Sequence, residues 1–565
     1  MRRTAWIFAI LLALTVTPAL AQSWPQVAAV CDHAGTRVTA TPARELEPFR
    51  NWRVAIADCG NDITARFYTD GDQIRVAFEY QKSSLWEGAP ARDYTAAVIL
   101  DGVEVARHEI VQQVPYTRWS WRLKEPAVIH ERRELVAAGM LPPLGDGIRG
   151  RQFGMGGTYE PLGLAGFTPA MGMAGGRQDF GVVPSATGEY IATGNTDARR
   201  VMFDQADSLG SWPFVARDPD TGAALRFDGD LIDAVYGVAS GSDQEARKIK
   251  YSLRKVTNRQ GKIIDQKPDH AHLPSFSYVP WMLTGDPYYL EGLQFEMVWV
   301  VGRSQNVGVS EFPRVVHNEQ MRSLGWAVRT TIQAALGVPD DVPSWLVPGS
   351  YYDWLSAGNA ETWKKVYVDG DRSVIRWGGG QDVAAFGQWS GSLERKDAAF
   401  QIKNSSYRRW MIDFFTLSVA HGVLGGLDEW RPLLDWQMKA AVDGGRWLRG
   451  RIGLFSAKPE SSINPGQFPV DWADFAARQG NLPELTHESG TDKPVGYNYY
   501  WQYYHSTIRV AEHFNVPGAA EIAAWLESAR LADTYAGEFQ FEFELKPPPD
   551  VAPGLPLSDF LQKPE

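Results

Sequence analysis

The chain contains very little cysteine: only Cys31 and Cys59 occur among 565 residues. Two thiols are too few for a structural zinc site, which takes four ligands. In an exported chain they favour one disulfide near the N-terminus. Two sequence motifs are also missing. There is no Gly-x-Ser-x-Gly elbow, which argues against esterase or peptidase action by that route, and no Gly-x-Gly-x-x-Gly in a strand-to-helix context, which argues against a dinucleotide fold.

Long apolar runs and an excess of positive charge are scarce as well. The N-terminal run follows Arg2 and Arg3 and ends at Ala19-Leu20-Ala21, so we expect a signal peptide over residues 1–21 and a secreted or periplasmic protein. No later run reaches the ~18 residues that a membrane span requires. The formal net charge of −11 argues against a nucleic-acid partner. An anionic ligand in a locally basic cleft stays open, and the sequence says nothing about the oligomeric state.

Aromatic residues are abundant instead, with 22 Trp and 21 Tyr. Several gather in residues 119–121, 351–354 and 497–505. Large rings usually fill a core, which is the simplest interpretation of most of them. Such rings also stack on the apolar faces of sugars. In an exported protein the 497–505 cluster therefore suggests carbohydrate binding, with core packing as the alternative.

The predicted fold class is α+β with more than one domain, because 565 residues exceed one small core. Residues 22–143 are expected to form an antiparallel β-sandwich, since their β-branched and aromatic runs partly alternate and Asp101-Gly102 is a hairpin turn. A glycine-rich connection follows at 144–178, and a proline-rich tail at 546–565. The expected strands lie at 64–68, 73–80, 96–105 and 118–123.

Residues 179–545 contain an internal sequence repeat at a spacing of about ninety residues. Asp179 precedes Pro-Ser by five residues, and Thr-Gly-Asn follows; Asp269 precedes Pro-Ser in the same way, and Thr-Gly-Asp follows. Each copy predicts a helical hairpin, and further pairs predict an (α/α)6-type toroid, with a superhelical solenoid as the competing geometry. The expected helices lie at 198–209, 290–302, 321–336, 410–423, 429–442, 504–514 and 519–531. The polar interval 241–267 is expected to form a β-hairpin or a loop.

The stretch from Gly175-Gly-Arg-Gln-Asp-Phe-Gly181 to Thr284-Gly-Asp286 resembles bacterial rhamnogalacturonan exolyase-like proteins. The order of a β domain, a glycine-rich connection and helix pairs is similar to that of toroid-containing polysaccharide lyases and glycosidases. The resemblance covers residues 150–335, and no complete catalytic motif can be aligned. It implies an enzyme that degrades an acidic polysaccharide, which would be its oligosaccharide or polysaccharide partner.

A polysaccharide lyase removes the proton α to a uronate carboxyl group and expels the 4-linked sugar. This chemistry needs a Tyr or His base and a group that neutralises the carboxylate. Arg322 and Arg329 lie seven residues apart on one predicted helix, where a solvated face is the default expectation. The candidate catalytic residues are His270, His272, Tyr278, Tyr500, His505, Asp179 and Asp269. The candidate substrate-binding residues are Arg322, Arg409, Trp281, Tyr352, Trp354, Asn498 and Trp501.

Two other functions stay open at this point. A glycoside hydrolase needs two carboxylates across the bond, for which Asp179 and Asp269 are equivalent positions of the repeat, and Glu291 and Asp353 are further candidates. Asp286 is better explained as a helix N-cap. The third hypothesis is a glycan-binding envelope protein without catalytic activity. No cofactor is expected, although His270 and His272 leave a divalent cation open.

Overall fold

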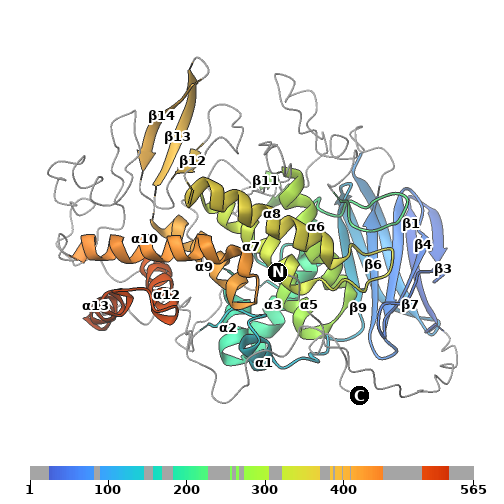
Figure 1. The fold of residues 1–565 in the computed structure, drawn as a ribbon. Helices are drawn as coiled ribbons and strands as arrows, with labels where there is room; N and C mark the ends of the chain where they lie inside the picture. Colours follow the sequence, from blue (N-terminus) through green and yellow to red (C-terminus); the bar gives the residue numbers. More distant parts are fainter. Residues whose placement is uncertain are drawn as a thin grey trace, which may run out of the picture.

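The computed structural model describes residues 24–81, 90–144, 157–167, 182–226, 255–257, 263–265, 273–303, 321–369, 382–385, 389–396, 399–406, 409–449 and 499–532. The fold is α+β, with antiparallel sheets in the N-terminal part and helices in the C-terminal part, as the sequence predicts (Figure 1). In the described part of the chain, every helix is too short or too polar to cross a bilayer.

Two antiparallel sheets make up the N-terminal part. One has the strand order β2-β1-β7-β8 and the other β3-β4-β5-β6-β9. The β7–β8 hairpin turns at Asp101 and Gly102, whose φ angles of 51° and 80° suit the tight turn that the sequence predicts. The strands are β1 (Val27–His33), β2 (Thr36–Ala40), β3 (Arg44–Glu45), β4 (Arg53–Asp58), β5 (Ile63–Thr69), β6 (Ile74–Tyr80), β7 (Arg92–Leu100), β8 (Val103–Gln113) and β9 (Arg118–Arg122).

Side chains from both sheets form one buried hydrophobic cluster. It includes Phe67 and Phe78 from the second sheet and Val98 from the first. The predicted disulfide is confirmed: Cys31 of β1 bonds to Cys59, just after β4, with an S–S distance of 2.04 Å. The bridge therefore joins the two sheets within their shared core.

The internal repeat is confirmed as two helical hairpins, α2 (Ser185–Thr193) with α3 (Thr196–Ser208), and α5 (Tyr278–Thr284) with α6 (Pro287–Arg303). Gly194 and Gly285 end the first helix of each pair at φ 75° and 62°, which glycine adopts without strain. The second helices are capped alike, because Asn195 accepts a bond from the Asp197 amide and Asp286 accepts one from the Tyr288 amide. Asp286 is thus the N-cap that the sequence predicts.

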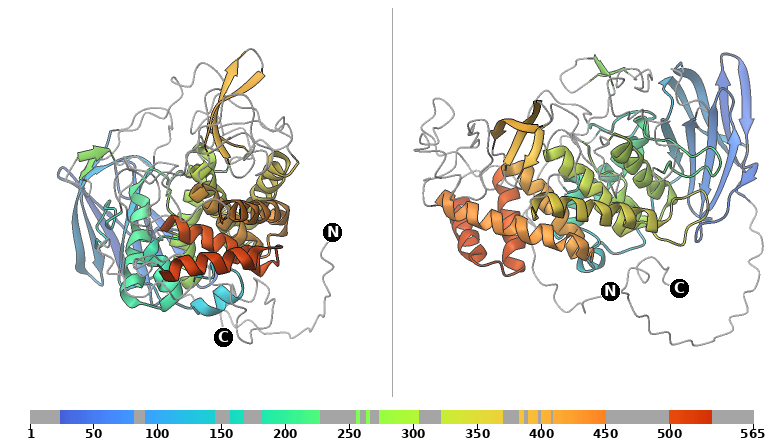
Figure 2. Two further views of the ribbon diagram at one scale, coloured as in Figure 1. Left: turned by 90° about the vertical axis from the view of Figure 1, so that its left-hand side faces the viewer. Right: turned by 45° about the horizontal axis from the view of Figure 1, so that its top comes forward.

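The remaining helices continue the pairing along the chain (Figures 1 and 2). The predicted helices are all found, and the structure adds α8 and the short α1, which sequence periodicity does not indicate. Part of the 241–267 interval is a hairpin, and a three-stranded sheet follows α8. The elements are α1 (Arg132–Ala137), η2 (Leu209–Ser211), β10 (Lys255–Thr257), β11 (Ile263–Asp265), α7 (Met321–Gly337), α8 (Gly349–Tyr367), β12 (Asp382–Ala385), β13 (Trp389–Lys396), β14 (Ala399–Ser406), α9 (Arg409–Leu424), η5 (Asp428–Trp430), α10 (Arg431–Arg449), α12 (Tyr499–His513) and α13 (Ala519–Ala532).

A buried ion network joins the second sheet to the helices. Along β6, Ile74, Val76 and Phe78 face the other sheet, whereas Arg75 and Glu79 face the helices, as the two-residue period of a strand requires. We call this cluster the interface network. It consists of five arginines, Arg66, Arg75, Arg118, Arg122 and Arg217, and five carboxylates, Glu79, Asp204, Asp207, Asp286 and Glu291.

The ion pairs of the interface network are short, and its five arginines balance its five carboxylates in charge. Arg75 lies 2.7 Å from Asp207 and 3.2 Å from Asp286. Glu291 lies 2.8 Å from Arg66 and 2.9 Å from Arg217. Buried charges are tolerated only when they are paired in this way. The network fastens the second sheet to α3 and α6, and it pairs Asp286 and Glu291, so neither is available as one of the two carboxylates that hydrolysis would need. Asp353, the other such candidate, is exposed on α8.

Candidate functional site

Three helices of the C-terminal part run in the same direction. Close contacts between α7 and α9 advance together: a Cβ on Gly325 would lie 3.2 Å from the Phe415 nitrogen, and one on Gly422 would lie 3.1 Å from Ile332. Residue numbers that rise together along both helices mean that the helices are parallel. Parallel neighbours that are separated by a return helix bring their N-terminal ends to one side of the fold.

Helix α12 has the same direction, which follows from its contacts with α10. Tyr504 donates a hydrogen bond to the Ala441 carbonyl at 3.1 Å, whereas Phe514 at the far end lies 4.2 Å from the Arg431 guanidinium. Falling numbers on α10 against rising numbers on α12 show that these two helices are antiparallel. Because α9 and α10 form a hairpin across a short loop, α12 is parallel to α9 and to α7.

Aromatic rings connect the three helices near their N-terminal turns. Trp326 of α7 lies 4.5 Å from Phe414 of α9, and Phe414 lies 4.0 Å from Tyr503 of α12, measured between ring centroids. The Phe414–Tyr503 pair is edge-to-face, an arrangement that is favourable beyond the area it buries. The row fixes the spacing of the three helix ends.

Four of the residues predicted from the sequence occur in the first turns of these helices. Arg322 is the second residue of α7, Arg409 opens α9, and Tyr500 and Trp501 are near the start of α12. Their side chains lie outside the described residues. His505, one turn further along α12, is buried. The fold thus gathers residues that are far apart in the sequence at one end of a helix layer.

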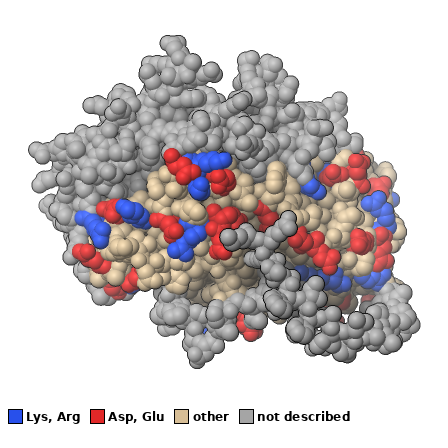
Figure 3. Space-filling view, viewed as in Figure 1, with Lys and Arg blue, Asp and Glu red and all other residues tan. Residues whose placement is uncertain are grey.

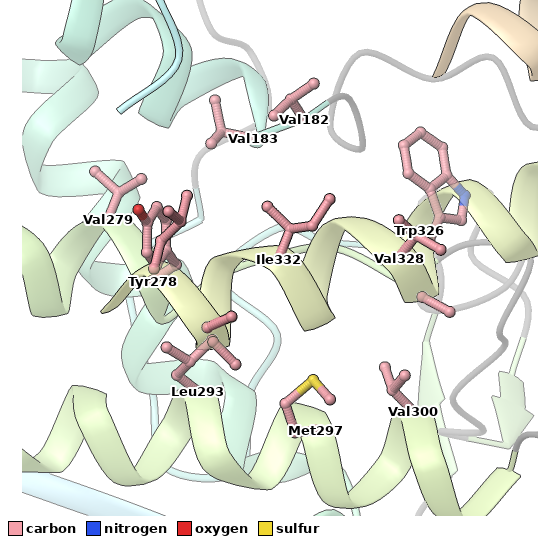
Figure 4. Packing of buried hydrophobic residues seen from close by; sticks show 14 of the residues in the cluster. Val182, Val183, Tyr278, Val279, Leu293, Met297, Val300, Trp326, Val328 and Ile332 are labelled. Atoms are coloured by element: carbon pink, nitrogen blue, oxygen red, sulfur yellow. The ribbon is translucent and has the colours of Figure 1, made fainter. Parts of the chain in front are cut away.

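In the second copy of the repeat, the segment that precedes α5 lies along α7. Arg329 donates to the Leu273 carbonyl at 2.8 Å, and Gln333, one turn on, accepts from the Ser275 hydroxyl at 2.5 Å. Gln333 also donates to the carbonyl of Val182 in the first copy at 3.0 Å. Figure 4 shows Val182 and Val183 on one side of Ile332 of α7, with α6 on the other side. Both Pro-Ser segments of the repeat are therefore held by one polar face of α7.

A buried acid and a buried base lie within this arrangement. Burial raises the pKa of Glu296 to about 7, although the amides of Phe276 and Ser277 and the charge of Arg329 oppose the shift. Burial lowers the pKa of Arg329 to about 9, against the opposing charge of Glu296. Burial disfavours the charged form of each group, and one partner is not enough to compensate. The pKa of Glu296 therefore lies near neutral pH.

Other predicted residues are placed in the core. The Tyr278 hydroxyl donates to the Met140 carbonyl, the Trp281 indole donates to the Gly337 carbonyl at 2.7 Å, and Tyr352 is buried. Burial raises the pKa of Tyr278 well above its usual range. Trp354 differs, since 39% of its surface is exposed on α8. The candidates Asp179, Asp269, His270, His272 and Asn498 lie outside the described residues.

One expectation is wrong and one residue is new. Arg329 was expected on a solvated face, but it is fully buried because it bonds to the loop before α5 and meets Glu296. The site residues predicted from the sequence do not include Glu296. The signal was present, since it is a lone carboxylate in the otherwise apolar stretch Phe295–Val301 of α6. A charge at such a position needs a partner when it is buried.

The exposed charges are mixed in sign on the face shown in Figure 3, where basic and acidic side chains of the described residues alternate. Among the described residues, three or more His, Cys, Asp or Glu side chains do not come together as a metal-binding group. No protein-family model, curated protein or solved structure matches the chain.

Proposed function

We propose that this protein is a secreted or periplasmic polysaccharide lyase, which cleaves an acidic polysaccharide by β-elimination. In this proposal, residues 22–143 are a β-sandwich and residues 179–545 are an (α/α)6-type toroid whose parallel helices line the substrate site. The observation that supports it best is the gathering of Arg322, Arg409 and Tyr500 in the first turns of three parallel helices.

The helix ends suit an anionic substrate for two reasons. The N-terminus of a helix carries about half a positive charge and free amide donors, so three parallel helices direct this polarity to the same side. Arg322 and Arg409 add full positive charges at that side of α7 and α9. In our proposal these two arginines hold the carboxylate of a uronate residue, which makes the neighbouring C–H bond more acidic.

Proton transfer then needs a base and an acid. We assign the base to His270 or His272, because the residues that follow them run along α7 in the same direction as the helix, from Leu273 beside Arg329 to Tyr278 beside Gly337. Tyr500 and His505 of α12 are the candidates for the acid that protonates the leaving oxygen.

The test is incubation with a panel of uronate-containing polysaccharides, followed by ultraviolet absorbance. β-Elimination leaves a conjugated double bond in the product, so absorbance rises with every cleavage. We expect a rise with at least one acidic polysaccharide and its loss, by about 100-fold or more, in His272→Ala. The Arg409→Gln variant should raise KM because it removes a carboxylate partner.

The matched control is Arg431→Gln, which removes a partly exposed arginine at the opposite, C-terminal side of the layer. It should leave the rate unchanged. New reducing ends without absorbance would overturn β-elimination and favour hydrolysis through Asp179 and Asp269. Retention of the polysaccharide with neither signal would favour a binding protein.

A further inference from the structure

Two charged side chains from different helices hold the short segment that precedes α5. One oxygen of Glu296 on α6 accepts hydrogen bonds from the Phe276 amide at 2.9 Å and from the Ser277 amide at 3.2 Å. Arg329 on α7 donates to the Leu273 carbonyl at 2.8 Å. All of these groups are buried. The segment is therefore held at both of its ends by buried polar side chains from two different helices.

The grip is tight on the α6 side. A Cβ added to Gly292 would lie 2.4 Å from the Ser277 hydroxyl oxygen, so only glycine lets the helix come this close to the segment. Removing either side chain leaves buried main-chain groups without their hydrogen-bond partner. Glu296 and Arg329 thus restrict the main chain of residues 273–277 far more than apolar side chains at their positions would.

We propose that Glu296 and Arg329 are positioning residues, which clamp residues 273–277 to α6 and α7 and so orient the chain that carries the catalytic base. The inference rests on the proposed function, because the base assigned there, His270 or His272, directly precedes the clamped segment. The clamp acts on the main chain and does not touch the substrate. Its contribution is geometric, since a displacement of about 1 Å at a reacting group can lower a rate 100-fold.

The same helix offers a matched control. Gln294 is buried on α6 and holds another loop with the same two-bond pattern, donating to the Val347 carbonyl at 2.8 Å and accepting from the Val347 amide at 3.2 Å. We compare Glu296→Met with Gln294→Met, which remove a main-chain grip of similar size from one helix. Hydrogen–deuterium exchange and the steady-state parameters kcat and KM are measured for both variants.

If the clamp exists, the two variants should differ both in the residues whose exchange rises and in kcat. In Glu296→Met, exchange at the amides of residues 274–283 rises about tenfold or more, and kcat falls about 10- to 100-fold with little change in KM. In Gln294→Met, exchange rises around residues 345–350 instead, and kcat is retained. Unchanged exchange at 274–283 in Glu296→Met, or an equal loss of kcat in both variants, would overturn the proposal.

Two further measurements keep the test decisive. If Glu296→Met does not fold, Glu296→Gln and Arg329→Met are compared in its place. Glu296→Gln keeps one acceptor oxygen and should retain most of the protection, whereas Arg329→Met should lose protection near Leu273. Exchange needs no substrate, so a wild-type protein without β-elimination would refute the proposed function while the exchange data still decide whether the clamp exists.

Discussion

Glu291 and Glu296 lie on the same helix and are both fully buried, yet their carboxyl groups are perturbed in opposite directions. Burial alone would raise the pKa of Glu291, but Arg217, Arg66 and Arg118 outweigh it and hold the pKa at about 2. Burial dominates at Glu296, where Arg329 is the opposing cation, and the pKa rises to about 7. Because both carboxyl groups are fully buried, the guanidinium groups that face them, rather than depth of burial, account for the difference between these two pKa values.

Two other carboxylates of the interface network differ in the same way. Asp207 lies against Arg75 and Arg122, and its pKa is lowered despite complete burial. Asp286 meets Arg75 at a longer distance, and burial raises its pKa. Two close guanidinium groups therefore outweigh burial at Asp207, whereas at Asp204, which Arg122 and Arg200 face at 3.4 Å and 2.9 Å, burial still raises the pKa. A pKa raised toward neutral, as at Glu296, is a property that functional sites use.

The largest expected loss of stability follows from removing the charge of Glu291. Glu291→Gln leaves Arg66, Arg118 and Arg217 buried with too little negative charge. Breaking a buried ion pair in this way destabilises proteins by about 3–5 kcal/mol. We expect a loss in that range in chemical denaturation at pH 7. A loss below 1 kcal/mol would show that the network is neutral with respect to stability.

The second prediction concerns the pH dependence of Glu296. Its folded-state pKa is raised from 4.5 to about 7, so the folded protein holds a proton more tightly than the unfolded chain. The stability that it contributes is fully present below pH 4.5 and is lost as the pH rises through 7. Between pH 5 and pH 8 the loss should be about 2–3 kcal/mol.

Glu296→Gln cannot ionise, so this part of the pH slope should disappear. The measurement is the free energy of unfolding of both proteins at pH 5 and pH 8. Glu291 provides the contrast, because its lowered pKa makes its contribution present above pH 4.5 and lost only as the pH falls through about 2. Equal slopes in wild type and Glu296→Gln would contradict the assignment.

We expect a smaller loss of stability when a carboxylate with a single close ion pair loses its charge. Asp286→Asn keeps the cap on α6, because asparagine accepts the Tyr288 amide equally well, and removes only the charge facing Arg75. We expect a loss of about 1 kcal/mol, seen as a modest fall in Tm. A loss equal to that of Glu291→Gln would mean that charge count does not govern the network.

The smallest effect is expected at the surface. Glu104 pairs with Arg107 at 2.6 Å, but both side chains are well exposed. Exposed pairs contribute about 0–1 kcal/mol. Glu104→Gln should therefore leave the denaturation midpoint within about 0.5 kcal/mol of wild type, and it serves as the baseline for the three buried variants.

Local features of the fold could be predicted from the sequence. The repeated Thr-Gly-Asn/Asp marks the turn of both hairpins, because glycine must supply the positive φ and the next residue caps the following helix. Asp101-Gly102 likewise specifies its own turn. These elements depend on neighbours within a few residues, so one sequence contains all of their determinants.

The long-range features could not be predicted. In β6 and β9 the alternate residues Arg75, Glu79 and Arg118 are typical of a solvent-facing side, but helices that come more than 100 residues later cover it. The same holds for Arg329, whose partners Leu273 and Glu296 come from other elements. Helix α8 was missed because its aromatic residues suggested a cluster rather than a helical face.

The charge balance of the interface network limits how this protein can be divided or recombined. The sheet supplies Arg66, Arg75, Arg118 and Arg122, and the helices supply Asp207 and Glu291. Either part alone would present a strongly charged face of one predominant sign to water. The helical part can be combined with another β-rich part only if that part carries arginines at the matching positions. In evolution and in protein engineering alike, the two parts must therefore be kept or exchanged together.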